Sequence, residues 1–244
     1  MKKTFLILAL LLPLAAAAQD SAEAVVQRYL KLLNYEALPA DSLLVMETTV
    51  SFHGSDDTYT LRRLYAVPNM MRVEVWHGDT LTNGYSTNGG SRHREYSRTL
   101  GWWNDAEHST FHKRIDSYDF RGPLYRWRER GIKLTYMGGA TTKGERLQVV
   151  RAEMADNYTR YYMFEQQSGL LVLMQERDED TTNTNTVLKA LRPRPIDYEV
   201  IHEYLPVGES LVPSEMSYMR DGLLTIMRTS AHFEPRNDLL FNKD

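Results

Sequence analysis

The spacing of apolar residues predicts one helix near the start of the chain. Over residues 20–34 the apolar side chains recur at helical period, which is typical of an amphipathic helix packed on one face. Asp20 stands at a capping position, and Glu23 three residues later completes the spacing of a capping box. We expect this helix to end before Pro39, which interrupts the pattern.

From residue 43 onward the period changes from 3.6 to 2, as expected for strands with one face buried. The predicted strands cover residues 43–52, 58–67, 71–75, a short segment ending at 85, 91–97, 132–137, 146–153, 158–166, 170–177, 196–205, 211–219 and 223–233. Glycine-containing turns are expected between them, above all at Asn88-Gly89-Gly90, Gly138-Gly139 and Ser168-Gly169, because these residues tolerate positive φ.

Two segments break the series of strands. Residues 104–130 are expected to form a helical lid, with Asp105 capping a helix that runs to about Tyr118 and a second short helix after Pro123. Residues 178–195 are mostly polar and are predicted to be an inserted loop.

These strands, at hairpin spacing, predict one large antiparallel sheet, a mainly β (α+β) fold. A sheet this wide must curl, because the twist accumulates from strand to strand. Its concave face needs a cover, which the first helix and residues 104–130 can supply. We therefore expect a curled sheet, covered by helices, with an apolar pocket between them.

The first residues are typical of a secretory signal peptide. Lys2 and Lys3 precede an apolar stretch and three alanines, which places the cleavage after Ala18. This gives residues 1–18 as the signal peptide and 19–244 as a single domain. The chain holds 0 cysteines, so it has no disulfide, no thiolate ligand and no cysteine for lipid attachment. We expect an exported, soluble periplasmic protein without a lipid anchor.

The charge balance and the motifs exclude several functions. The net charge of −3 becomes −5 without the two lysines of the signal peptide, which disfavours nucleic acid as a partner. No G-x-S-x-G, H-E-x-x-H or G-x-G-x-x-G motif occurs, so we expect no enzyme and no cofactor. His108 and His112 have the spacing of two metal ligands on a helix, but two surface histidines are the commoner arrangement, and no metal site is predicted.

Methionine is the most conspicuous apolar residue of the predicted sheet. Ten of the 11 methionines are distributed over most of its length, from Met46 to Met227. Methionine is flexible and polarizable, which suits a surface that accepts acyl chains of variable shape. Alternating methionine and aromatic residues also occur in ordinary cores, so composition alone leaves both interpretations open.

Several features together resemble the LolA-type outer-membrane lipoprotein carriers and their relatives. A signal peptide and a helix precede a strand ending near Phe52, and Val67-Pro68-Asn69-Met70-Met71-Arg72 opens another. An Asn88-Gly89 turn follows where the family usually has Asp-Gly. Residues 147–151, the paired segments 161–164 and 170–174, and the closing segment 237–241 extend the resemblance over most of residues 20–244.

This resemblance implies an unclosed antiparallel half-barrel with an apolar cavity for acyl chains. The cavity would be lined by inward-facing apolar residues of the strands: Met46, Val50, Phe52, Leu61, Met71, Val73, Val75, Met163 and Met174. The lid would cover it with Phe111, Tyr118, Leu124 and Trp127. In the family an arginine on an early strand ties the barrel to the lid. Arg72 is the matching residue, with Arg62 or Arg63 as alternatives.

The resemblance implies a periplasmic carrier that shields the acyl chains of a lipoprotein or lipid and transfers them toward the outer membrane. Membrane-bound donor and acceptor proteins would then be its partners. A sensor or protein-interaction module of the same fold is the alternative, since one fold hosts several functions. A hydrolase using His108 and His112 is the third hypothesis.

Overall fold

The computed structural model describes residues 21–89, 92–105, 119–142, 144–154, 159–177, 197–220 and 222–242. Thirteen of its segments are strands, and all of them belong to one sheet in the order β6-β5-β4-β3-β2-β1-β13-β12-β11-β10-β9-β8-β7. The strands are β1 (Ser42–Phe52), β2 (Thr58–Ala66), β3 (Met70–His77), β4 (Thr80–Asn88), β5 (His93–Ser97), β6 (Trp102–Asp105), β7 (Lys133–Thr142), β8 (Glu145–Glu153), β9 (Thr159–Glu165), β10 (Leu171–Arg177), β11 (Asp197–Val207), β12 (Ser210–Arg220) and β13 (Leu223–Pro235).

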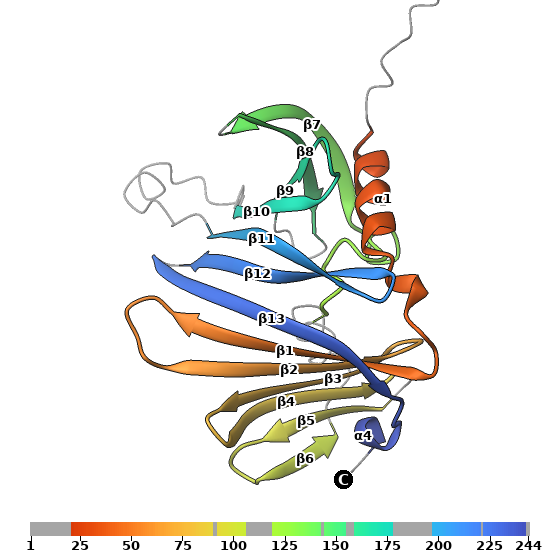
Figure 1. The fold of residues 1–244 in the computed structure, drawn as a ribbon, viewed down its shortest axis with the longest axis vertical. Coiled ribbons are helices and arrows are strands. Elements are labelled where there is room, and N and C mark those ends of the chain that lie inside the picture. The colour runs from red at the N-terminus through yellow and green to blue at the C-terminus, as the bar shows by residue number, and fades with distance from the viewer. Residues whose placement is uncertain are drawn as a thin grey trace, which may run out of the picture.

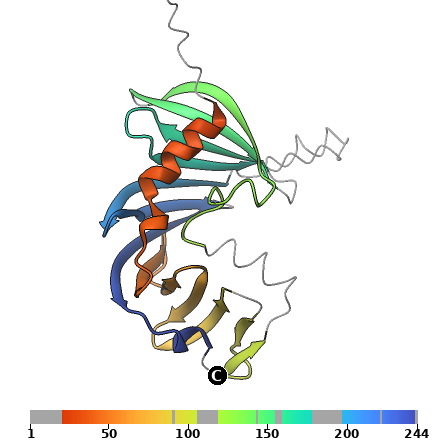
Figure 2. The same cartoon turned by 90° about the vertical axis from the view of Figure 1, so that its right-hand side faces the viewer.

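Every pairing in this sheet is antiparallel, and the sheet does not close into a barrel, because β6 and β7 lie at opposite ends of the strand order. Figure 1 shows the strands stacked from β7 to β6, and Figure 2 shows the sheet curving in profile. The predicted curled antiparallel half-barrel is therefore confirmed. Its centre is the pairing of β1 with β13, which joins the early strands to the late ones.

The first helix, α1 (Ala22–Leu33), forms where the apolar spacing predicts it. Its cap is Ser21, whose hydroxyl accepts a hydrogen bond from the Ala24 amide at 3.1 Å, so the expectation that Asp20 caps the helix is wrong. Asn34 ends the helix in the left-handed conformation with φ 50°. The helix contacts β7, β8 and β12 and lies across the upper half of the sheet in Figure 2.

The two faces of the sheet bury different clusters because side chains alternate along each strand. The inner face packs against α1 and contributes the larger core, with Leu44, Met46 and Val73 among its buried residues. The outer face carries a smaller cluster that includes Leu43, Leu64 and Phe241, which belongs to the short C-terminal helix α4 (Leu239–Asn242). The sheet therefore has an apolar side chain layer on each face near β1 to β3.

The expected helical lid differs from what the structure shows. Trp102–Asp105 is the edge strand β6, and residues 119–132 form consecutive turns without a helix. Gly122, Arg126 and Gly131 all have positive φ, and Pro123 lies among them, so the backbone cannot continue as a helix. We name residues 119–132 the covering segment. Residues 106–118 of the predicted lid, the signal peptide 1–18 and the loop 178–195 lie outside the described residues.

One expected turn is also wrong. Gly138 and Gly139 lie within β7, which continues to Thr142. Gly138 has φ 99° at a register shift between β7 and β8, so this glycine accommodates a β-bulge. The alternation from Leu134 to Tyr136 predicts the strand. The two glycines that follow are typical of a turn, so the sequence does not show that β7 stays paired with β8 beyond the bulge.

Candidate functional site

Four of the predicted cavity residues meet at one end of the inner face. Val50 and Phe52 of β1, Leu61 of β2 and Val75 of β3 line an open hollow of about 580 Å³, of the size that small-molecule sites usually have. Ser55, Asp57, Tyr59 and Leu223 complete its lining. We name these eight residues the apolar hollow. Its walls come from neighbouring strands because β1 pairs with β2, and β2 with β3.

The remaining predicted cavity residues lie elsewhere. Met46, Met71 and Val73 have side chains that are 1%, 5% and 0% exposed, so they belong to the packed core next to the hollow. Met174 of β10 is partly buried against the same core. Met163 of β9 alternates with the inner-face residues Tyr162 and Phe164, which places it on the outer face. The inner face thus brings together all of the predicted residues except Met163.

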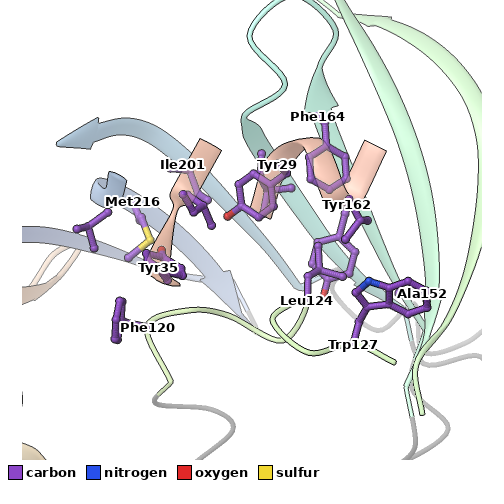
Figure 3. Packing of buried hydrophobic residues seen from close by; sticks show 14 of the residues in the cluster. Tyr29, Tyr35, Phe120, Leu124, Trp127, Ala152, Tyr162, Phe164, Ile201 and Met216 are labelled. Atoms are coloured by element: carbon purple, nitrogen blue, oxygen red, sulfur yellow. The ribbon is translucent and has the colours of Figure 1, made fainter. Parts of the chain in front are cut away.

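The covering segment packs on the inner core through its apolar side chains. Leu124 is 2% exposed and Trp127 is 7% exposed, as expected for the two predicted lid residues that the structure describes. Phe111 and Tyr118 lie outside the described residues. Figure 3 shows Leu124 and Trp127 beside Tyr162, while Phe120 lies beneath Tyr35, with their ring centres 5.0 Å apart.

A hydrogen bond from Arg121 to Tyr65 joins the covering segment to β2, and a buried ion pair within the segment holds Arg121 in place. The carboxylate of Asp119 accepts hydrogen bonds from Arg121 at 2.8 and 2.9 Å and from Arg130 at 3.2 Å. Arg121 also donates to the Tyr65 hydroxyl at 2.9 Å. Burial lowers the pKa of Arg121, but the hydrogen bond and charge of Asp119 outweigh that effect and raise it. The connection between barrel and cover therefore runs from Tyr65 through Arg121 to Asp119.

Arg72 does not make that connection. It lies on the outer face, pairs with Glu74 at 2.6 Å and donates to the Leu240 carbonyl oxygen at 2.7 Å. Its guanidinium also lies 4.4 Å from the ring centre of Trp103. Arg72 therefore attaches α4 to the outside of the sheet, which does not support the lid-gating role proposed for it from the resemblance.

Arg63 is the arginine of the early strands that faces inward. It interrupts an apolar stripe of the sequence, between Leu61 and Tyr65, and this break in the pattern is the signal that marks it. Its Nη2 donates to the Thr48 hydroxyl at 2.8 Å, and Thr48 in turn hydrogen bonds to Thr229. Burial lowers the pKa of Arg63 to about 10, although the nearby Tyr35 and acidic groups oppose the change.

Glu199 of β11 is a further ionizable group near this inner cluster. Burial raises its pKa, while the positive charges of Arg160 and Arg63 partly oppose that effect. Arg63 was an alternative to Arg72 in the sequence analysis, whereas Asp119, Arg121 and Glu199 were missed. Asp119 and Arg121 stand in a segment without a regular period, and nothing in the predicted strand 196–205 marks Glu199 as buried.

A second depression lies between α1 and the covering segment. It has a volume of about 720 Å³ and is lined by Arg28, Lys31, Tyr35, Trp127 and eight mostly polar neighbours. Its lining is more polar than that of the apolar hollow, and Arg128 and Glu23 form an ion pair of 2.7 Å across the helix and the segment. This depression therefore follows the seam where the covering segment meets the helix.

Within the described residues, no group of three or more histidine, cysteine or acidic side chains is arranged to hold a metal. His108 and His112 lie outside this part of the chain. No helix in the same part is both long and apolar enough to cross a bilayer.

No protein-family model matches the sequence, and no curated protein is significantly similar to it. Solved structures do match the fold. A LolA superfamily protein from Nitrosomonas europaea has a TM-score of 0.60 at 11% identity, covering 92% of this chain and 98% of its own. A DUF1329 family protein from Desulfovibrio piger has a TM-score of 0.61 at 10% identity, covering 91% and 97%.

A third similar structure is a domain named for outer-membrane lipoprotein sorting, from Vibrio parahaemolyticus. Its TM-score is 0.55 at 12% identity, covering 89% of this chain and 97% of that one. At such low identity the likeness concerns the fold. Together with the open curled sheet and the apolar inner face, it shows that the chain has a LolA-like fold.

Proposed function

We propose that this protein is a periplasmic carrier that shields the acyl chains of a lipoprotein or lipid on the inner face of the half-barrel. The observation that carries the proposal is the apolar hollow, where four residues selected from the sequence line one open cavity of about 580 Å³. Each methylene that moves from water into such a site contributes about 0.8 kcal/mol. A chain of several methylenes is therefore held by burial alone, without an enzymatic step or a cofactor.

The covering segment gives this site a route to release. Leu124 and Trp127 close part of the inner core, and the hydrogen bond from Arg121 to the Tyr65 hydroxyl holds the segment on β2. A longer acyl chain needs more of the inner face than the hollow exposes, so the segment would have to move away. Membrane-bound donor and acceptor proteins are the proposed partners that favour the open or the closed arrangement.

The binding test uses a dansyl-labelled fatty acid with the purified protein. Replacing Leu61 by Glu puts a charge into the apolar hollow and should weaken probe binding at least tenfold, because an unpaired charge is costly beside an acyl chain. Met137→Glu is the matched control, since Met137 is 53% exposed on β7, away from the hollow. Fluorescence titration gives the affinities, and circular dichroism verifies that both variants fold.

Equal affinity of the wild type and of Leu61→Glu for the fatty-acid probe would show that the apolar hollow is not the acyl-binding site. A second measurement, native mass spectrometry of the protein from a periplasmic extract, asks whether lipid is already bound. A lipid or acylated-peptide adduct supports the carrier.

A protein-interaction module is the second candidate function. The observation that favours it is β6, the edge strand of the sheet within the described residues, where Trp102 is 56% exposed. An exposed aromatic residue on an edge strand is a common docking element. A stable complex with another protein, together with no lipid in the native mass spectrum and no probe binding, would favour this function over the carrier.

A further inference from the structure

Among the described residues, Arg63 makes only one hydrogen bond, and its Nε–H is buried without a partner. No carboxylate forms an ion pair with it in this part of the chain, where Asp119 is already bound by Arg121 and Arg130. An arginine is costly to bury without an anion, because its charge loses the surrounding water. Among the described residues, the inner face therefore carries a positive charge that no carboxylate contacts directly.

The position of Arg63 relates this charge to the apolar hollow. Arg63 is two residues from Leu61 on β2, and Thr48 is two residues from Val50 on β1, so all four side chains face inward. Two residues along a strand span about 7 Å. The Arg63 side chain lies opposite Met46, yet its Nη2 reaches Thr48, which lies opposite Leu61. The guanidinium thus extends toward the hollow.

The two ends of the hollow differ in charge. At the outer rim, Asp57 is a lining residue, and its side chain is 69% exposed beside His77. At the inner end, the next inward-facing residue after Leu61 on β2 is the cation Arg63. An amphiphile with a negative head is repelled by the acid at the rim and attracted by the cation inside. Its head therefore points inward, and its hydrocarbon tail lies over the apolar residues of the hollow.

The surroundings of Arg63 also limit the size of the head. Its direct cross-strand neighbours are Met46 and Val73, which are 1% and 0% exposed. Arg63 is half-buried, and with one hydrogen bond from Nη2 and a buried Nε without a partner its planar guanidinium fork has donors left for a ligand. A flat carboxylate fits such a fork with two parallel hydrogen bonds, whereas a bulky head would have to displace the packed neighbours.

We propose that Arg63 binds the carboxylate of a single-chain fatty acid whose tail occupies the apolar hollow. This inference rests on the acyl-binding function proposed above and names its ligand class. Asp119 and Glu199 are the acidic groups whose charges also act on Arg63, and neither contacts its guanidinium directly.

The test compares dansyl-labelled undecanoic acid with its methyl ester, which has the same tail and an uncharged head. The wild type should bind the acid about tenfold more tightly than the ester, the gain typical of a hydrogen bond to a charged group. Arg63→Met should bring the affinity for the acid down to that for the ester and leave the ester unaffected. Arg62→Met is the matched control, because Arg62 is the adjacent residue on the outer face, 3.5 Å from Glu47.

The outcomes separate this inference from the carrier function. If the wild type binds acid and ester equally well, Arg63 does not hold the head, and acyl binding stands. If neither probe binds, the carrier function itself is wrong. If Arg63→Met does not fold, carbon-13 NMR of carboxyl-labelled dodecanoate on the wild type decides. The bound carboxyl should then titrate at a lower pH than the free acid, and an unchanged or higher titration would overturn the proposal.

Discussion

Single residues decide how the cover is held on the sheet. Asp119 has a side chain that is 3% exposed, and it accepts hydrogen bonds from the backbone amide and the guanidinium of Arg121 and from Arg130. Two arginines around one buried carboxylate leave no uncompensated acid there. The guanidinium of Arg121 also lies 4.3 Å from the ring centre of Tyr125 and 4.8 Å from that of Tyr65. The Arg121 side chain thus joins the covering segment to β2.

Replacing Asp119 by Ala should lower the free energy of unfolding by about 3–5 kcal/mol, because it leaves Arg121 buried without its anion. The matched control is Glu129→Ala, since Glu129 is 69% exposed and its ion pair with Arg126 is 3.6 Å long. The control should change stability by less than about 1 kcal/mol. Urea unfolding measures both values, and similar small losses would contradict the role given to Asp119.

At the scale of elements, the sequence predicts the helices and strands in which apolar residues recur at a regular period. The alternation of apolar residues locates the strands from Leu44 to Val75 closely, and helical spacing locates α1. Residues 104–130 have no regular period, and the structure shows no helix where it describes them, since residues 104–105 end β6 and residues 119–130 form turns. The turns of the covering segment follow from Gly122, Pro123 and Gly131.

Part of the candidate site was predictable for the same reason. The residues of the apolar hollow alternate on strands, so their common face follows from the period. The sequence does not show on which face of the sheet Met163 lies, because its neighbours Tyr162 and Phe164 are apolar too. Arg63 pairs with Val73, the residue next to Arg72 on β3, so Arg63 and Arg72 lie on opposite faces of the sheet. The sequence alone does not give this pairing.

The short helix α4 illustrates how an element this small is kept in place. Phe241 is 1% exposed on the outer face, and its carbonyl oxygen accepts a hydrogen bond from Ser86. Phe241→Ala should reduce the free energy of unfolding by about 3–5 kcal/mol, because it leaves a cavity under the helix. Leu239, in the same helix, is 71% exposed, so Leu239→Ala should cost under about 1 kcal/mol. Thermal unfolding of both variants checks the contrast.

At the scale of the whole molecule, four tyrosines of the inner core respond to alkaline pH together. Burial raises the pKa of Tyr162 to about 12, and it also raises the pKa values of Tyr29, Tyr35 and Tyr204. Above about pH 10 the unfolded chain releases phenol protons that the native state retains. The native state therefore binds more protons in that range, so the free energy of unfolding decreases as the pH rises.

Unfolding in urea at about pH 8 and about pH 11 should show this loss, up to about 1.4 kcal/mol per pH unit for each such tyrosine. Tyr162→Phe removes one titrating group and should make the decrease less steep. A pH dependence that stays the same in this variant would show that Tyr162 does not contribute.

The order of strands also determines when the fold can be completed. The sheet is joined at its centre by β1 and β13, which pair from Ser42 with Pro235 to Phe52 with Thr225. Contacts between residues so distant in sequence form slowly, because a long loop must close first. The early strands can form hairpins during synthesis, but β1 lacks its second neighbour until residue 235 has been made. A nascent chain of this protein thus remains incompletely folded for most of its synthesis, with one edge of β1 open to chaperones.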